Sequence, residues 1–81
     1  MNLKKVGENE IELLLNDYKI LISYQTPVAA MDRRTGEYYC TEKKWSVTTS
    51  RHINSWLSDC QAESCEKRPQ AYFDNLLAEV K

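Results

Sequence analysis

The chain has 81 residues, of which 42% are hydrophobic and 28% are charged, and its formal net charge is −1 at pH 7. A chain of this length forms one domain at most, and this composition is typical of a folded protein rather than a disordered one. The two glycines, Gly7 and Gly36, are too few for a glycine-rich phosphate loop, and the apolar runs are too short to span a membrane.

The first half of the sequence predicts β-strands. Ile11, Leu13 and Leu15 stand at every second position, and this period of two gives a strand at about residues 10–15 one apolar face. A run that is rich in β-favouring side chains comes after the next turn. It predicts a second strand at about residues 18–31.

The same half ends with a third strand. Pro27 lacks a backbone N–H, so it indicates an edge position or a kink in the second strand. The segment around Gly36 predicts a turn, because glycine adopts positive φ without strain. The aromatic segment at about residues 37–42 then predicts the third strand.

The second half predicts two amphipathic helices, at about residues 49–59 and 69–80. Each has one apolar stripe at helical spacing: Ile53, Trp56, Leu57 and Cys60 in the first, and Phe73, Leu76, Leu77 and Val80 in the second. Together the elements predict the α+β fold class, with a three-stranded antiparallel β-meander followed by two amphipathic helices packed on one face. Residues 1–81 are expected to form this single domain.

The sequence holds three cysteines, Cys40, Cys60 and Cys65, and a single histidine, His52. An odd number of cysteines without an export signal is typical of free thiols in a reducing cytoplasm. The four side chains are of the types that bind zinc, but the spacing between Cys60 and Cys65 is wider than in zinc knuckles. Cys60 also fits the apolar stripe of the first helix. We therefore expect no metal and no cofactor.

Catalysis by a cysteine requires a base beside the thiol. His52 is the only imidazole, and the sequence indicates no partner that would orient it. Cys40 on the third strand is the thiol most able to approach it, but no feature of the sequence requires that contact. We therefore expect no catalytic residue and no enzymatic activity.

A basic segment leads into the first helix. Lys43 and Lys44 lie just before it, and Arg51 and Asn54 lie in its first turns. A helix N-terminus attracts anions, and arginine and asparagine are suited to base edges. Residues 31–54 carry a net charge of +2, which is weak for a DNA-binding domain. Nucleic-acid binding through these four side chains is the alternative function.

Aromatic residues crowd the half that predicts the sheet: Tyr18, Tyr24, Tyr38, Tyr39 and Trp45. Adjacent residues of a strand point to opposite faces, so either Tyr38 or Tyr39 faces away from helices that cover only one side. Aromatic anchors dominate the energy of many protein interfaces. An exposed face of this kind is typical of protein recognition.

Two stretches, SYQTPVAAMD and GEYYCTEKKWSVTTSRHINSWL, span about Ser23 to Leu57. They follow the pattern Ser-Tyr-x-Thr-Pro-Val-Ala and then Trp-Ser-x-Thr-Thr-Ser-x-His-Ile-Asn-x-Trp-Leu. In this respect the chain resembles a family of small, uncharacterised single-domain proteins from phages and plasmids. The resemblance implies no activity or cofactor. It implies a mobile-element protein in a host cytoplasm, and small proteins of that kind often bind and block a host defence or regulatory factor.

We therefore expect a small non-enzymatic binding protein of phage or mobile-element origin, which binds a host protein and inhibits or modulates it. Its contacts are expected on the sheet face or the first helix, at Tyr24, Tyr39, Trp45, Arg51, His52 and Asn54. The protein is expected to be cytoplasmic, without membrane contact, and either a monomer or a homodimer.

Overall fold

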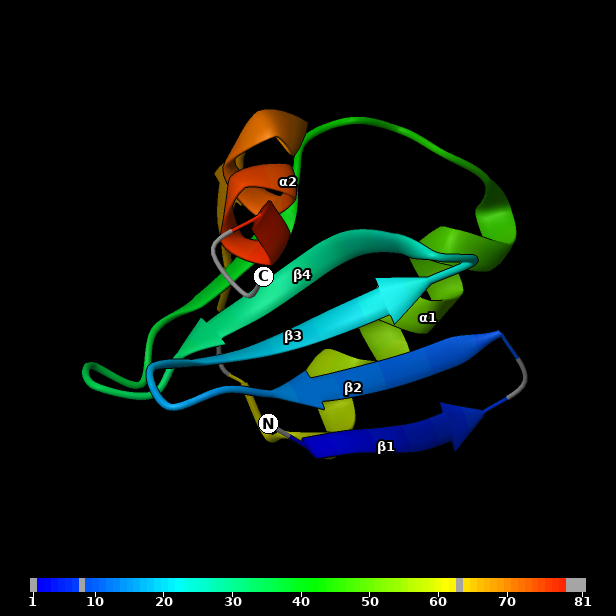
Figure 1. The fold of residues 1–81 in the computed structure, drawn as a ribbon. Helices are drawn as coiled ribbons and strands as arrows, with labels where there is room; N and C mark the ends of the chain where they lie inside the picture. The colour runs from blue at the N-terminus through cyan, green and yellow to red at the C-terminus, as the bar shows by residue number, and fades with distance from the viewer. Residues whose placement is uncertain (1, 8, 63, 79–81) are drawn as a thin grey trace.

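One six-stranded sheet organises the computed structural model, which describes residues 2–7, 9–62 and 64–78. The strands are β1 (Asn2–Gly7), β2 (Glu10–Leu14), β3 (Tyr18–Ser23), β4 (Thr26–Asp32), β5 (Tyr38–Thr41) and β6 (Glu66–Arg68). They lie side by side in chain order, and the first four are visible in Figure 1. Each pair from β1 to β5 is antiparallel, whereas β6 runs parallel to β5.

The predicted three-stranded meander is therefore wrong, although the α+β class is confirmed. The run at 18–31 is two strands, because Tyr24 and Gln25 turn the chain between them. β1 has no alternation of apolar residues from which it could be predicted, and its backbone pairs with that of β2. β6 is only three residues long and is held by the parallel pairing with β5.

Pro27 lies in β4, inside the sheet rather than at its edge. It pairs with Ile22 beside a register shift, where the chain of β4 contains one additional residue, Val28. A bulge of this kind tolerates proline because the regular ladder is already interrupted there. Of the two predicted alternatives for Pro27, the irregular position is the one that the structure has.

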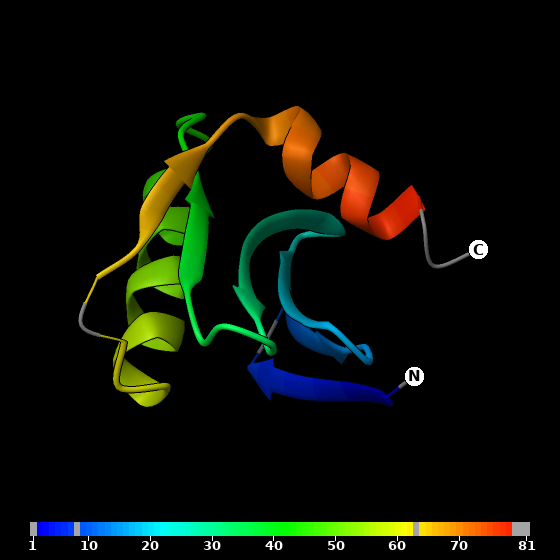
Figure 2. The ribbon, with the colours of Figure 1, turned by 90° about the vertical axis from the view of Figure 1, so that its left-hand side faces the viewer.

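The two helices are α1 (Val47–Asp59) and α2 (Gln70–Ala78). The predicted placement of both on one face is also wrong: Figure 2 shows α1 and α2 on opposite sides of the curved sheet. Because β5 and β6 are parallel, the chain must cross over between them, and α1 makes that crossing. Positions 79 and 80 of the predicted second helix lie outside the described residues. Neither described helix is long and apolar enough to cross a bilayer.

The core has two layers because adjacent strand residues point to opposite faces. On the α2 side the buried cluster consists of Leu13, Ile20, Ala30, Tyr39, Phe73 and Leu76. On the α1 side it consists of Leu21, Val28, Ala29, Cys40 and Trp56. The apolar stripes predicted for the helices are confirmed within the described residues, since their members are buried or packed against these clusters.

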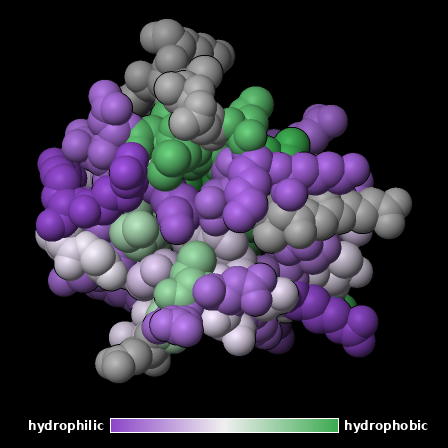
Figure 3. Space-filling model, turned by 90° about the horizontal axis from the view of Figure 1, so that it is seen from below, coloured by the Kyte–Doolittle hydropathy of each residue, from purple (hydrophilic) through white to green (hydrophobic). Residues whose placement is uncertain are grey.

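α2 packs mainly on β4, so the same face remains open over β1 and β2. Leu3 of β1 is 68% exposed and Ile11 of β2 is 38% exposed. Figure 3 shows the molecule from below, where apolar surface gathers in one region and is bordered by hydrophilic side chains. This open part of the sheet forms one side of the site described next.

Candidate functional site

A two-residue turn places Tyr24 at one end of the sheet. Tyr24 and Gln25 join β3 to β4 with φ angles of 48° and 68°, the left-handed pair that a type I′ hairpin turn requires. The backbone N–H of Tyr24 donates a hydrogen bond to the carbonyl of Asn9, at 3.0 Å. The backbone is thus held by its neighbours, while the residue is 50% exposed.

His52 of α1 supports the ring of Tyr24. The two rings are stacked, with centroids 5.7 Å apart and planes inclined by 25°. The Nδ1 atom of His52 lies 2.8 Å from the hydroxyl of Ser23 on β3, and its Nε2 atom lies 4.0 Å from a carboxylate oxygen of Glu10 on β2. A serine O–H that donates to Nδ1 leaves the Nε2–H directed at the carboxylate.

Hydroxyl groups extend this network to the start of α1. The Ser23 and Thr49 hydroxyl oxygens are 3.4 Å apart, and the Ser46 hydroxyl donates to that of Thr49 at 3.2 Å. Ser46 is also the N-cap, since its oxygen accepts from the backbone N–H of Thr49 at 3.1 Å. The network therefore fixes the first turns of α1 to β3 and β2, because partly buried polar groups that find partners rigidify their surroundings.

Ser23, His52 and Glu10 are the residue types of a hydrolytic triad. Ser23 is only 1% exposed, however, and its hydroxyl lies against both the histidine and Thr49. A serine nucleophile must present its oxygen to a substrate. The contacts of these three residues join α1 to the sheet beneath Tyr24.

Trp45 lies next to this network and is held by α2. Its indole N–H donates to the side-chain oxygen of Gln70 at 3.0 Å, and the ammonium of Lys43 lies 4.1 Å from its ring centroid. Gln70 in turn receives a hydrogen bond from Thr41 at 2.9 Å and donates to the carbonyl of Pro27 at 2.7 Å. Trp45 is nevertheless 43% exposed, so its position is fixed while its ring remains accessible.

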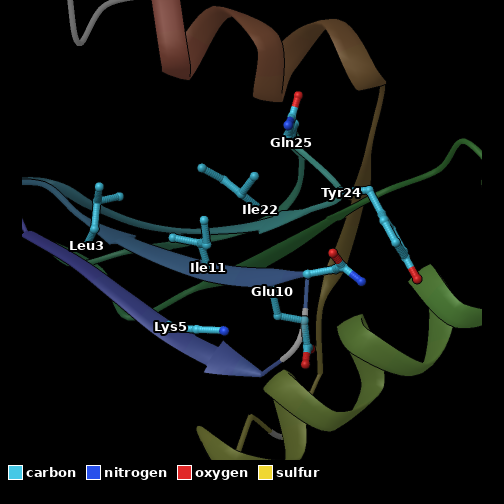
Figure 4. A pocket seen from close by; sticks show the side chains of 8 residues that line it. Leu3, Lys5, Glu10, Ile11, Ile22, Tyr24 and Gln25 are labelled. Atoms are coloured by element: carbon cyan, nitrogen blue, oxygen red, sulfur yellow. The ribbon is translucent and has the colours of Figure 1, made fainter.

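Two hollows, on opposite faces of the sheet, share Tyr24 as a wall. The smaller has a volume of about 210 Å³ and is lined by Ser23, Tyr24, Thr26, Val28, Trp45, Ser46 and Thr49. The larger is open, measures about 620 Å³ and is lined by Leu3, Lys5, Asn9, Glu10, Ile11, Ile22, Tyr24 and Gln25. In Figure 4, the side chains of Leu3, Ile11 and Ile22 rise from one face of the sheet, whereas Tyr24 extends toward α1.

Most of the exposed large hydrophobic side chains border these hollows. The described residues include five such side chains, and four of them, Leu3, Ile11, Tyr24 and Trp45, line one hollow or the other. The fifth, Val47, lies in the first turn of α1. We call the area formed by those four side chains and the two hollows the Tyr24 surface.

Three of the residues expected to contact a partner, Tyr24, Trp45 and His52, come together at or beneath this surface. Arg51 and Asn54 are exposed on α1, and the remaining basic candidates, Lys43 and Lys44, are exposed in the loop before it.

Tyr39 lies apart from the others, in the cluster beneath α2. It is 7% exposed, its ring packs edge-on against Tyr72, and the guanidinium of Arg68 lies 5.1 Å from the ring centroid. Its hydroxyl donates to Glu37 at 2.7 Å, and this hydrogen bond is the main reason why the pKa of Tyr39 is raised. Tyr39 therefore offers a partner little surface.

The thiols and His52 are in different places. Cys40, Cys60 and Cys65 belong to or pack against the core cluster that includes Trp56, whereas His52 lies with Ser23 and Glu10. Within the described residues no three His, Cys, Asp or Glu side chains are grouped so that they could hold a metal. Burial, followed by the hydrogen bond to Cys65, raises the pKa of Cys40 to about 11, so this thiol is protonated at neutral pH.

Several residues of the site are absent from the sequence-based prediction. Glu10, Ser23 and Gln70 come from three separate elements, and their contacts depend on a sheet order that the sequence does not announce. Leu3 belongs to the strand that was not predicted. The signal that was available is the pattern around Ser23-Tyr24 and Trp45–His52, whose members gather at one place.

No curated protein and no solved structure is significantly similar to the chain. One family model matches it, over residues 1–75, which is nearly the whole chain and includes all of the Tyr24 surface. The chain therefore belongs to that family, described as a family of unknown function (DUF8033).

Proposed function

We propose that the chain is a small non-enzymatic binding protein of phage or mobile-element origin, and that it recognises a host protein through the Tyr24 surface. The observation that carries this proposal is that Leu3, Ile11, Tyr24 and Trp45 line two hollows, one on each face of the sheet, that meet at Tyr24. Exposed apolar side chains concentrated in one place mark interaction sites more often than scattered ones do.

The two aromatic side chains have the properties of interface anchors. Tyrosine and tryptophan combine a large apolar area with a polar group, and residues of this kind supply most of the energy at many interfaces. The stacking on His52 and the hydrogen bond to Gln70 hold the two rings before any partner arrives. Binding then costs little additional side-chain entropy.

The mode of action that fits such a surface is obstruction. A domain of 81 residues is large enough to cover a surface that its partner needs. We propose a host defence or regulatory protein in the cytoplasm as the partner, because the resemblance to phage and plasmid proteins implies that setting.

The proposal is tested by capture of host proteins with two site variants and one matched control. Tyr24→Asn removes the ring but retains a residue that tolerates the left-handed backbone, and Trp45→Ala removes the indole. Val47→Ser, at an exposed hydrophobic residue outside both hollows, is the control. Circular dichroism establishes that all three variants are folded.

We expect one protein to be captured stoichiometrically by the wild type and by Val47→Ser, and its affinity for each site variant to be lower by about tenfold or more. The affinity measured with the purified partner should change little with salt. Equal capture by all variants would contradict the proposal. Retention of nucleic acid instead, with an affinity that falls steeply with salt and on replacement of Lys43 and Lys44, would favour the alternative function.

A further inference from the structure

We propose that Cys40 and Cys65 are a redox modification site, in which a low-molecular-weight disulfide such as glutathione disulfide converts the two thiols into an intramolecular disulfide. Their sulfur atoms are 2.8 Å apart, and both thiols are free in the structure. The bond itself requires about 2.05 Å, so the sulfurs need only a small further approach. This inference is independent of the proposed function.

The fold brings these two residues together from distant parts of the sequence. Cys40 lies in β5, and Cys65 immediately precedes β6, which pairs with β5 so that Tyr39 is opposite Glu66. The third thiol, Cys60, packs against the same core cluster but belongs to the C-cap of α1. Cys60 therefore serves as an internal control for whether the disulfide forms specifically between Cys40 and Cys65.

Accessibility determines the order of the two chemical steps. Cys65 is partly exposed, whereas Cys40 is only 1% exposed. The thiolate of Cys65 attacks glutathione disulfide, forms a mixed disulfide and releases one glutathione thiolate. Cys40 then attacks the sulfur of Cys65 and releases the second glutathione. The two protons lost by the protein thiols are taken up by the two glutathione thiolates, so two thiols are oxidised and one disulfide is reduced.

The second step should be the slower one at neutral pH, despite the short distance. Burial raises the pKa of Cys40 to about 11, so only a small part of this thiol is ionised near pH 7. The rate at which the mixed disulfide closes should therefore rise as the pH is raised above 7. The proximity of the sulfurs offsets part of this cost, because the attack takes place within one molecule.

The bond would alter the properties of the domain. It closes a loop that contains all of α1 and holds the short β6 strand against β5. A cross-link over a loop of this length removes conformational freedom from the unfolded chain, which corresponds to a melting temperature higher by about 14–28 °C. In a reducing cytoplasm such bonds are transient and respond to the state of the glutathione pool.

The test treats the full-length protein with glutathione disulfide in defined ratios to glutathione, and reads the product by intact mass and peptide mapping. We expect the loss of two hydrogen atoms, one peptide pair joined through Cys40 and Cys65, and a higher melting temperature that dithiothreitol reverses. Cys60→Ser should give the same product. Cys65→Ser should give no internal bond, and Cys40→Ser should stop at the mixed disulfide on Cys65.

Peptide mapping of the wild type identifies which cysteines form the disulfide, even where a variant folds poorly. A bond that includes Cys60, disulfide-linked dimers as the main product, or three intact thiols under fully oxidising conditions would each overturn the proposal. An equal yield of the Cys40–Cys65 bond at equilibrium with the same glutathione mixture in urea-unfolded protein would overturn it as well, because the folded chain would then not be what brings the pair together.

Discussion

At the scale of single residues, Ser23 connects β3 to α1 through one small side chain. Its hydroxyl contacts His52 and Thr49, both on α1, while its backbone belongs to β3. The same small group thereby holds the imidazole on which Tyr24 stacks. The buried hydroxyl of Ser23, with its two partners, therefore helps to determine how α1 is positioned on the sheet.

Ser23→Ala should lower the free energy of unfolding by about 1–3 kcal/mol, because Nδ1 of His52 loses its partner and the buried hydroxyl of Thr49 keeps only its contact with Ser46. Chemical denaturation measures this loss. Ser55→Ala, at an exposed position of α1, is the matched control and should stay within about 0.5 kcal/mol of the wild type. Equal stability of the two variants would show that the network contributes nothing to the fold.

At the scale of elements, Gln70 connects the start of α2 to three other segments. It contacts Pro27 in β4, Thr41 in β5 and Trp45 in the loop before α1. These three hydrogen bonds explain how α2, which packs on the opposite face of the sheet from α1, still influences the Tyr24 surface. Gln70 thus connects α2 directly to the indole of Trp45.

Gln70→Ala should destabilise the protein by about 2 kcal/mol, since four side-chain hydrogen bonds are lost and the partly buried ones are costly to break. It should also release the indole of Trp45, which is visible as stronger quenching of tryptophan fluorescence by acrylamide. Asn75→Ala, at an exposed position of the same helix, is the control for both readouts. Unchanged quenching in Gln70→Ala would mean that the tryptophan is positioned by other contacts.

The elements also show how far the sequence predicts this fold. The apolar stripe that includes Trp56 and the alternation at Leu13 are correct, because both depend on local periodicity. The hairpin at Tyr24-Gln25 escapes prediction because neither residue is glycine or asparagine, the usual residues of such turns. β1 and β6 depend on a neighbouring strand for their existence, which no local pattern records.

The site was predictable to the same degree. Tyr24, Trp45 and His52 belong to a sequence pattern, and the pattern indicates that they matter without indicating where they lie. Their meeting point depends on the antiparallel order of β2, β3 and β4, and on the crossing of α1 behind them. Long-range pairing of this kind is set by tertiary structure rather than by propensity.

At the scale of the whole molecule, a buried thiol and a half-buried phenol make the free energy of unfolding decrease at alkaline pH. Burial is the main cause that raises the pKa of Cys40 from 9.0 to about 11 and that of Tyr72 from 10.0 to about 12. In the unfolded chain these groups ionise at lower pH than in the folded one. As the pH rises from the unfolded pKa values to the folded ones, ionisation favours the unfolded chain, and the free energy of unfolding therefore falls.

We expect the free energy of unfolding to be constant with respect to these groups below about pH 9 and to fall between about pH 9 and 12, with a loss on the order of 2–3 kcal/mol from Cys40 alone between about pH 9 and 11. Denaturation curves under reducing conditions across this range measure the slope. Cys40→Ala should be less stable throughout but should show a shallower fall. An identical slope in both proteins would place the effect in other groups.

The central claim is that one surface, which includes Leu3 and Trp45 on either side of Tyr24, meets one partner. Site-specific photocross-linking in the host tests it most directly, with a benzophenone side chain at position 3, at position 45, or at the exposed control position 75 on α2. We predict that positions 3 and 45 cross-link to the same host protein and that position 75 does not. Cross-linking at position 75 alone, or to unrelated proteins at positions 3 and 45, would contradict the account.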